Sequence, residues 1–258
     1  MRLLVSVATP ADAVAAVAGG ADIVDAKDPR RGALGAVTLP VFHAVCAAVA
    51  GAAPVSAALG DAESEGAIVR DARAFARAGA AFVKVGFGGI TDPARVTAVI
   101  EAALQATPDV VAVAYADAAS TGSAHPVDVI GAAARAGARG VLIATADKRG
   151  PALTALVPDR DLTAWICSAH REALQVAIAG KLTAADIESL LQCGADIVGV
   201  RSAACEGGRI GTVSSRNVHA LRQIVHGGAR VRDARVRDAT VHGGEADLET
   251  RLTPCRPR

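Results

Sequence analysis

Lysine is scarce in this 258-residue sequence. Of its 27 basic residues, 23 are arginine and only four are lysine, namely Lys27, Lys84, Lys148 and Lys181. An alanine- and arginine-rich composition of this kind suggests a coding bias under which arginine replaces lysine on the surface. A guanidinium group can neither lose its proton nor form an imine. The four lysines are therefore candidates for positions that need an amine, with chance retention of any one of them as the alternative.

An excess of either charge is also absent, because 27 basic residues face 26 acidic ones, a net charge of +1. Such a balance creates no field that would recruit nucleic acid or an acidic membrane, so a small molecule is the expected partner. The long uncharged stretch from Val37 to Leu59 contains two prolines and indicates a buried helix followed by a strand. The N-terminal apolar run ends before Pro10, too early for a signal peptide. We expect a cytoplasmic protein without a membrane partner.

Metal-binding and disulfide patterns are missing as well. The five cysteines are scattered without a C-x-x-C, and the six histidines show no H-E-x-x-H spacing. In a chain this large and apolar, such cysteines are typical of reduced cytosolic thiols. The sequence therefore predicts neither a metal site nor a cofactor.

The composition that is present, 52% apolar and 21% charged, is that of a folded chain with a sizeable core. The length suits one large α/β domain, which we place at residues 1–226. Residues 227–258 form a tail rich in Arg, Asp, Gly and Thr, which reads either as an exposed strand or as disorder. We assign the tail no chemistry.

A Gly-Ala pair followed by a β-branched run occurs four times, and successive alanines are 59, 58 and 57 positions apart. Each glycine is predicted to end a helix, and each run to form a buried strand. The pairs are Gly20-Ala21, Gly79-Ala80, Gly137-Ala138 and Gly194-Ala195.

Further strands and helices are expected between these pairs. The strand candidates are Leu3–Val7, Val55–Leu59, Val110–Tyr115 and Val176–Ala179, and the helix candidates include Pro10–Ala18, Glu63–Ala78, Pro126–Ala136 and Thr183–Gln192. Eight strands alternating with eight helices predict a (β/α)₈ TIM barrel with a parallel eight-stranded sheet. A doubly wound sheet is the alternative, but no G-x-G-x-x-G follows the first strand.

All four lysines fall at the C-terminal ends of predicted strands or inside the barrel, where barrel enzymes work. Asp25 and Lys27 share one side of their strand, and a charged pair cannot face the outer helices, so both should point inward. Lys84 is expected inside as well. Two amines beside one carboxylate would lower the pKa of one lysine and produce a neutral nucleophile. The alternative is a structural ion pair between Asp25 and one lysine.

Glycines and cations after the seventh and eighth strands indicate a phosphate site, since exposed backbone N–H groups there hold phosphate in many barrels. The candidates are Gly180, Lys181, Arg201, Gly207, Gly208 and Arg209.

Several phrases resemble those of the (5-formylfuran-3-yl)methyl phosphate synthase family of methanofuran biosynthesis. They are IVDAKDP from Ile23, GALGA from Gly32, FVKVG from Phe82, YAD from Tyr115 and VGVRSAAC from Val198. The resemblance runs in order from Leu3 to about Gln223. It implies a TIM-barrel lyase that needs no metal and condenses two molecules of glyceraldehyde 3-phosphate, losing phosphate and water. We also expect a homo-oligomer.

The resemblance further implies roles for individual residues. The family's Schiff-base lysine falls on Lys27 and its acid–base lysine on Lys84, while the strand-2 aspartate falls on Asp25 and the strand-6 lysine on Lys148. The family reads Asp-Thr-Ala-x-Lys after strand 6, where this chain has Ala144 in place of the aspartate.

That departure predicts slow furan formation with binding largely intact. The alanine at position 144 is consistent with two explanations: the chain is a disabled variant of the family enzyme, or it belongs to a branch of the family with altered chemistry. A class I aldolase acting on another sugar phosphate, and a non-catalytic binder of phosphorylated ligands, are the rival hypotheses.

Overall fold

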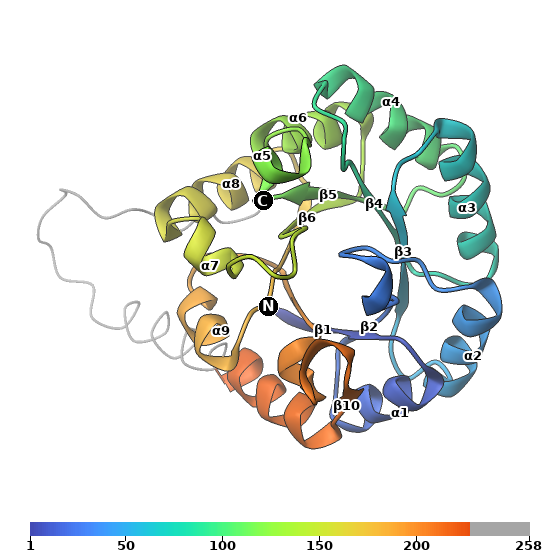
Figure 1. The fold of residues 1–258 in the computed structure, drawn as a ribbon, viewed down its shortest axis with the longest axis vertical. Coiled ribbons are helices and arrows are strands. Elements are labelled where there is room, and N and C mark those ends of the chain that lie inside the picture. The colour runs from blue at the N-terminus through green and yellow to red at the C-terminus, as the bar shows by residue number, and fades with distance from the viewer. Residues whose placement is uncertain (228–258) are drawn as a thin grey trace, which may run out of the picture.

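The computed structural model describes residues 1–227, so the tail predicted from residue 227 lies, beyond its first residue, outside the described part. Eight parallel strands pair in chain order, and β1 also pairs with β8, which closes the barrel (Figure 1). The predicted (β/α)₈ barrel is confirmed. The strands are β1 Arg2–Val7, β2 Ile23–Ala26, β3 Val55–Asp61, β4 Val83–Gly86, β5 Val110–Tyr115, β6 Gly140–Ala144, β7 Gln175–Ala179 and β8 Ile197–Val200.

Helices surround the barrel, one after each strand (Figure 1). Local signals start them: Thr9 caps α1 by accepting a hydrogen bond from the Asp12 N–H, and Pro10 occupies the first turn. The outer helices are α1 Pro10–Ala18, α2 Leu39–Val49, α3 Glu65–Arg77, α4 Pro93–Leu104, α6 Pro126–Ala136, α8 Asp159–Arg171, α9 Ala184–Leu190 and a last one at 215–227. The uncharged stretch from Val37 to Leu59 forms α2 and β3, as predicted.

The recurring Gly-Ala pairs follow helices, as the sequence predicts. Their glycines have φ between +77° and +94°, a region that a side chain disfavours. Gly137, for example, ends α6 in the left-handed conformation, and its N–H donates to the carbonyl of Ala134. Each pair thus turns the chain from a helix into the next strand.

Alternation along the strands separates two cores. Residues such as Leu3, Val24 and Ile143 pack between the barrel and the helices, whereas Leu4, Ile23, Phe82, Val111 and Leu142 pack inside the barrel. Polar residues on the inner face are therefore directed to the barrel axis. None of the helices described in residues 1–227 is long and apolar enough to cross a membrane.

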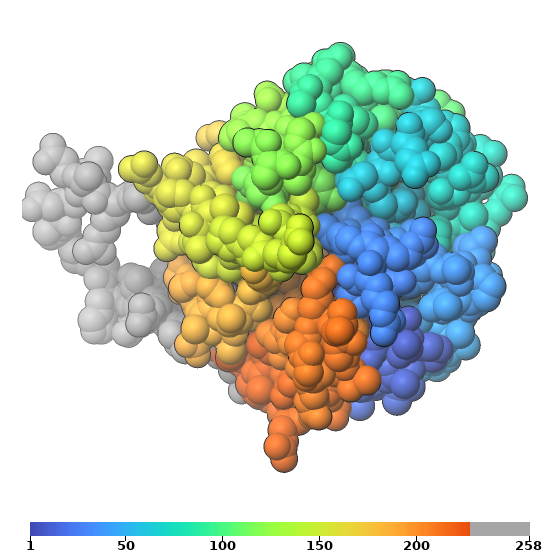
Figure 2. Space-filling view, in the orientation of Figure 1, coloured from blue at the N-terminus to red at the C-terminus, as the bar shows by residue number. Residues whose placement is uncertain are grey.

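Short elements follow the C-terminal ends of the strands. They are η1 Pro29–Arg31, α5 Ala118–Thr121, α7 Leu153–Leu156, η2 Ser202–Ala204, β9 Cys205–Glu206, η3 Gly208–Ile210 and β10 Thr212–Val213. Figure 2 shows the segments after β2 (blue), β6 (yellow-green) and β8 (orange) meeting over the middle of this face. These segments narrow the entrance to the barrel.

Candidate active site

A cavity occupies the inside of the barrel at the C-terminal ends of its strands. Lys27, Lys84, Lys148 and Lys181 all line it, as the sequence predicts. The cavity is the place where barrel enzymes carry their chemistry.

Asp25 is completely buried and lines this cavity. Its carboxylate forms an ion pair with the Lys84 ammonium and accepts hydrogen bonds from Ser6 Oγ at 3.0 Å and Ser56 Oγ at 2.8 Å. The register puts Ser6, Asp25 and Ser56 side by side on β1, β2 and β3. Burial alone would raise the pKa of this carboxyl, but the charges of Lys84 and Lys27 and the hydrogen bonds hold it below the usual value.

Asp25 is paired with Lys84, and no carboxylate of residues 1–227 is hydrogen-bonded to Lys27. Burial lowers the pKa of Lys27 to about 7, and the positive charges of Lys84, Lys148 and Arg209 act in the same direction, against the Asp25 charge. A substantial share of Lys27 is then neutral near pH 7, which is the form that attacks a carbonyl. The ion pair that the sequence offered as the alternative thus forms between Asp25 and Lys84, and a neutral nucleophile at Lys27 stays a prediction.

Lys148 lies on the segment between β6 and α7. Its amine donates to the carbonyl and, at 3.3 Å, to the hydroxyl of Thr145. Burial lowers its pKa to about 8, with Arg209 contributing repulsion. The segment is held by Asp117, whose carboxylate accepts from the backbone N–H groups of Ala146 at 2.8 Å and Asp147 at 2.7 Å.

Ala144 is buried on the inner face of β6 and lines the cavity together with Leu142. A side chain at position 144 is therefore directed into the cavity. Asp147 does not replace the missing carboxylate, because it is exposed and accepts a hydrogen bond from the Arg149 N–H at 2.8 Å. The wall of the cavity formed by β6 thus has no acid.

Gly180 and Lys181 line the cavity after β7. Lys181 has φ of +58°, unusual for a residue with a side chain, and its amine donates to the Gly150 carbonyl. One of the three N–H bonds of the ammonium is thereby used, which leaves two for a phosphate oxygen.

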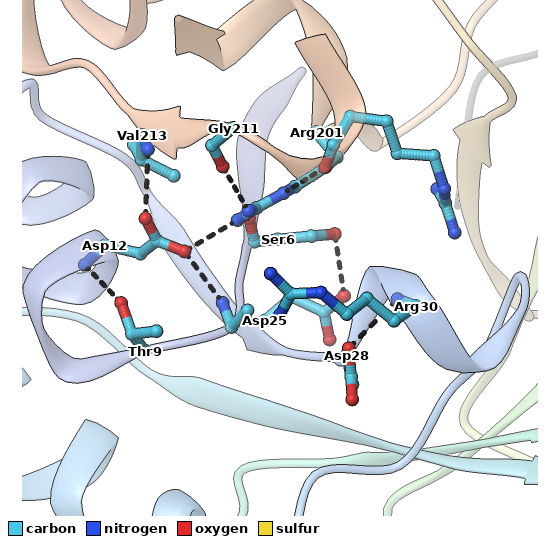
Figure 3. A network of polar contacts seen from close by, with 11 residues as sticks. Ser6, Thr9, Asp12, Asp25, Asp28, Arg30, Arg201, Gly211 and Val213 are labelled. Atoms are coloured by element: carbon cyan, nitrogen blue, oxygen red, sulfur yellow. Dashed lines mark hydrogen bonds and ion pairs between the residues drawn. The ribbon is translucent and has the colours of Figure 1, made fainter. Parts of the chain in front are cut away.

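Arg201 is buried and lines the cavity, but its guanidinium is engaged (Figure 3). It forms an ion pair with Asp12 at 2.8 Å and donates to the carbonyls of Ser6, Arg209 and Gly211. Four of its five N–H groups are therefore used. This arrangement favours a role in holding the segment after β8 over a direct role in phosphate binding.

Arg209 has more donors to spare than Arg201. Within residues 1–227, hydrogen bonds occupy only its Nη2, which donates to the carbonyls of Pro29 at 3.2 Å and Gly32 at 2.7 Å. Gly207 and Gly208 are exposed and do not line the cavity. Their positive φ values form the turn that directs Arg209 inward, so these glycines shape the site without reaching it.

Comparison with known proteins identifies the family to which the chain belongs. A family model described as 4-HFC-P synthase matches residues 3–222. The chain belongs to the 4-HFC-P synthase family. A relative from Archaeoglobus fulgidus, named (5-formylfuran-3-yl)methyl phosphate synthase, is 34% identical over 88% of this chain and 100% of its own length. One of the same name from Methanopyrus kandleri is 36% identical over 87% of this chain and 98% of its own. The resemblance seen in the sequence is confirmed.

Solved structures resemble this family member in fold alone. The 3-hexulose-6-phosphate synthase from Salmonella typhimurium has a TM-score of 0.60 at 20% identity, covering 88% of this chain and 100% of that one. Phosphoribosyl anthranilate isomerase from Thermus thermophilus has a TM-score of 0.59 at 17% identity, covering 91% and 100%.

Several residues of this 4-HFC-P synthase family site escape sequence reasoning. Ser6, Ser56 and Asp12 belong to none of the quoted phrases, and only strand register or long-range contact brings them to the site. Asp117 ends the YAD phrase, which was the one available signal. Among residues 1–227, no group of three or more His, Cys, Asp or Glu side chains is placed to hold a metal ion.

Proposed function

We propose that this chain condenses two molecules of glyceraldehyde 3-phosphate into (5-formylfuran-3-yl)methyl phosphate, through a Schiff base on Lys27, for methanofuran biosynthesis. The observation that carries the proposal is the position of Lys27 in the cavity just after β2, beside an Asp25 carboxylate that is already paired with Lys84. Burial at this position lowers the pKa of Lys27 to about 7. A neutral amine at the end of a barrel strand can attack an aldehyde. The names of the relatives supply the product.

The imine on Lys27 then serves as an electron sink. A C–H bond next to the iminium carbon can lose its proton, and phosphate or hydroxide can leave from the neighbouring carbon. We assign Lys84 the proton transfers, with Asp25 orienting its amine. These are the steps of a carbon–oxygen lyase that acts on phosphates.

Phosphate is held, in this proposal, by Lys181 and Arg209 and by the backbone at Gly180. Both side chains keep N–H groups free and both line the cavity. Binding energy at the phosphate is remote from the reacting carbons and positions them.

Incubation of the protein with glyceraldehyde 3-phosphate, followed by ultraviolet absorbance of the furan aldehyde, tests the proposal. Ala144 favours one rival, a binder of phosphorylated ligands without catalysis. That rival predicts affinity for the substrate and no furan. A class I aldolase on another sugar phosphate would form the imine with a different aldehyde and release a different product.

Imine formation is expected to follow the ionisation of Lys27. Because the folded-state pKa is lowered to about 7 from the usual 10.5, the amine is protonated below pH 7 and neutral above it. The rate of imine trapping by cyanoborohydride should therefore rise through pH 7 and level off. A rate that continues to rise toward pH 10 would mean that Lys27 is an ordinary lysine.

Arg209→Ala is expected to weaken substrate binding by about 1.5–3 kcal/mol, the value of a hydrogen bond to a charged group. Calorimetry with glyceraldehyde 3-phosphate measures this. Arg149→Ala is the matched control, since Arg149 is exposed and outside the cavity lining. Equal affinity in the two variants would move the phosphate site away from Arg209.

A further inference from the structure

Tyr115 is a cavity residue to which the proposed function gives no role. It is the single tyrosine of the sequence, lies at the end of β5, and is 1% exposed. Its side chain lines the cavity, and its hydroxyl donates to Asp61 Oδ1 at 2.8 Å. Asp61 ends β3 and is exposed. The hydroxyl of Tyr115 therefore lies between the cavity and a carboxylate that is open to solvent.

The surrounding backbone keeps this pair in place. A Cβ atom at Gly86 would lie 2.6 Å from the Tyr115 hydroxyl and closer still to Asp61 Oδ1, so only glycine fits there. The N–H of Gly88 donates to Asp61 Oδ1 at 3.0 Å and fixes the carboxylate. Gly86 lies two residues after Lys84 on β4, on the same inner face of the barrel. Tyr115 and Asp61, which contact Gly86, therefore lie next to Lys84 on the side toward the C-terminal ends of the strands.

The described lining of the cavity has no free carboxylate that could accept a proton. Among the described lining residues, Asp25 has the only carboxylate, and it is occupied by Lys84, Ser6 and Ser56. The other ionisable lining groups, Tyr115 apart, are lysines and arginines. Position 144, which pairs with Tyr115 in the register of β5 and β6, is alanine. In the described part of the chain, Tyr115 is thus the one lining group that is hydrogen-bonded directly to an exposed carboxylate.

We propose that Tyr115 and Asp61 form a proton relay that takes a proton from a substrate hydroxyl in the cavity to solvent. The inference rests on the proposed function and specifies one of its steps. The hydrogen of the phenol is directed at Asp61, so a lone pair of Tyr115 Oη is available to accept a proton from the cavity. Tyr115 touches the substrate, whereas Asp61 acts through Tyr115 and is a positioning residue.

The step served is closure of the furan ring, which requires a new carbon–oxygen bond. A lone pair of the substrate hydroxyl forms this bond to an aldehyde carbon, and the carbonyl π pair moves to the carbonyl oxygen. That oxygen takes a proton from the Lys148 ammonium. The hydroxyl proton passes to Tyr115 Oη as Tyr115 gives its own proton to Asp61, and Asp61 releases it to solvent. Lys148 recovers its proton from water, so the relay ends unchanged.

Burial and the Asp61 charge raise the pKa of Tyr115 above its usual value. The tyrosine therefore holds its own proton unless it receives another, which suits a relay that accepts and donates in one motion. A free phenolate is not required.

Two variants break the relay with little change of shape. Tyr115→Phe removes the hydroxyl, and Asp61→Asn keeps an oxygen that can accept from Tyr115 and Gly88 but takes up no proton. Glu63→Gln is the matched control, because Glu63 is an exposed carboxylate beyond the end of β3 for which the structure shows no hydrogen bond to Tyr115. Each protein is incubated with glyceraldehyde 3-phosphate. Borohydride-trapped imine, furan aldehyde and the KM are measured separately.

Tyr115→Phe and Asp61→Asn should each lower furan formation about 100-fold, and the double variant no further. Trapped imine and KM should stay within about twofold of the unmodified chain, as should all readouts of Glu63→Gln. Undiminished furan formation in either relay variant overturns the relay, and so does a loss of imine that parallels the loss of furan. If the unmodified chain traps no imine, the proposed function itself fails.

Discussion

Lys27→Arg should reduce furan formation by at least about 10³-fold, because arginine keeps the positive charge but cannot form an imine. The variant preserves a cation beside Asp25 and the Lys84 pair. Because burial at this position disfavours a charged amine, the permanently charged arginine should also lower the thermal stability of the barrel. Ultraviolet absorbance of the furan aldehyde measures activity, and thermal denaturation checks the fold.

A second variant distinguishes the loss of the nucleophilic amine from any effect of the larger, charged arginine side chain on the site. Lys27→Met removes the charge as well as the amine and should be as inactive as Lys27→Arg. The Lys27→Met protein should be at least as stable as the unmodified chain. Burial lowers the pKa of Lys27 to about 7, which means that a protonated amine at this position costs the folded protein free energy. Furan formation by either variant at the rate of the unmodified chain would contradict a covalent role for Lys27.

Ala144→Asp should raise furan formation by about 10²-fold, the usual contribution of a positioned proton-transfer group being 10²–10⁴. The side chain at 144 is directed into the cavity from the inner face of β6. A carboxylate there would serve the lysines that now lack one. Substrate affinity should change little, because the imine lysine and the phosphate groups are untouched.

The comparison also tests why this chain departs from its family. Turnover measured side by side for Ala144→Asp and the unmodified chain decides it, with Asp147→Asn as control for the exposed carboxylate nearby. Equal turnover of Ala144→Asp and the unmodified chain would mean that position 144 is dispensable and that other groups, such as Tyr115 with Asp61, already move the proton.

The barrel and the location of the lysines could be predicted because both follow from local pattern. Gly-Ala pairs at nearly equal spacing mark where helices end, and strand ends in a parallel barrel face one cavity. Scarcity of lysine made the four amines conspicuous, and all four lie in the cavity.

The partners of these groups could not be predicted, because they depend on register and on distant contacts. The pairing of Asp25 with Lys84, and not with Lys27, depends on how β1, β2, β3 and β4 are aligned. The same alignment brings Ser6 and Ser56 to hydrogen-bond with Asp25. Arg201 forms an ion pair with Asp12, 189 residues away in the sequence. Most N–H groups of this expected phosphate ligand are therefore already hydrogen-bonded within the protein. Gly207 and Gly208 are exposed and outside the cavity lining, whereas Arg209 lines it, so contact of this turn with phosphate stays a prediction.

Peptide mapping after borohydride reduction tests the central claim most directly. The protein is reduced in the presence of glyceraldehyde 3-phosphate, digested and examined by mass spectrometry. A substrate-derived mass on the peptide that contains Lys27, absent without substrate and absent in Lys27→Arg, is the predicted result. An adduct on Lys84 or Lys148, or no adduct while furan forms, would contradict the assignment of the Schiff base to Lys27.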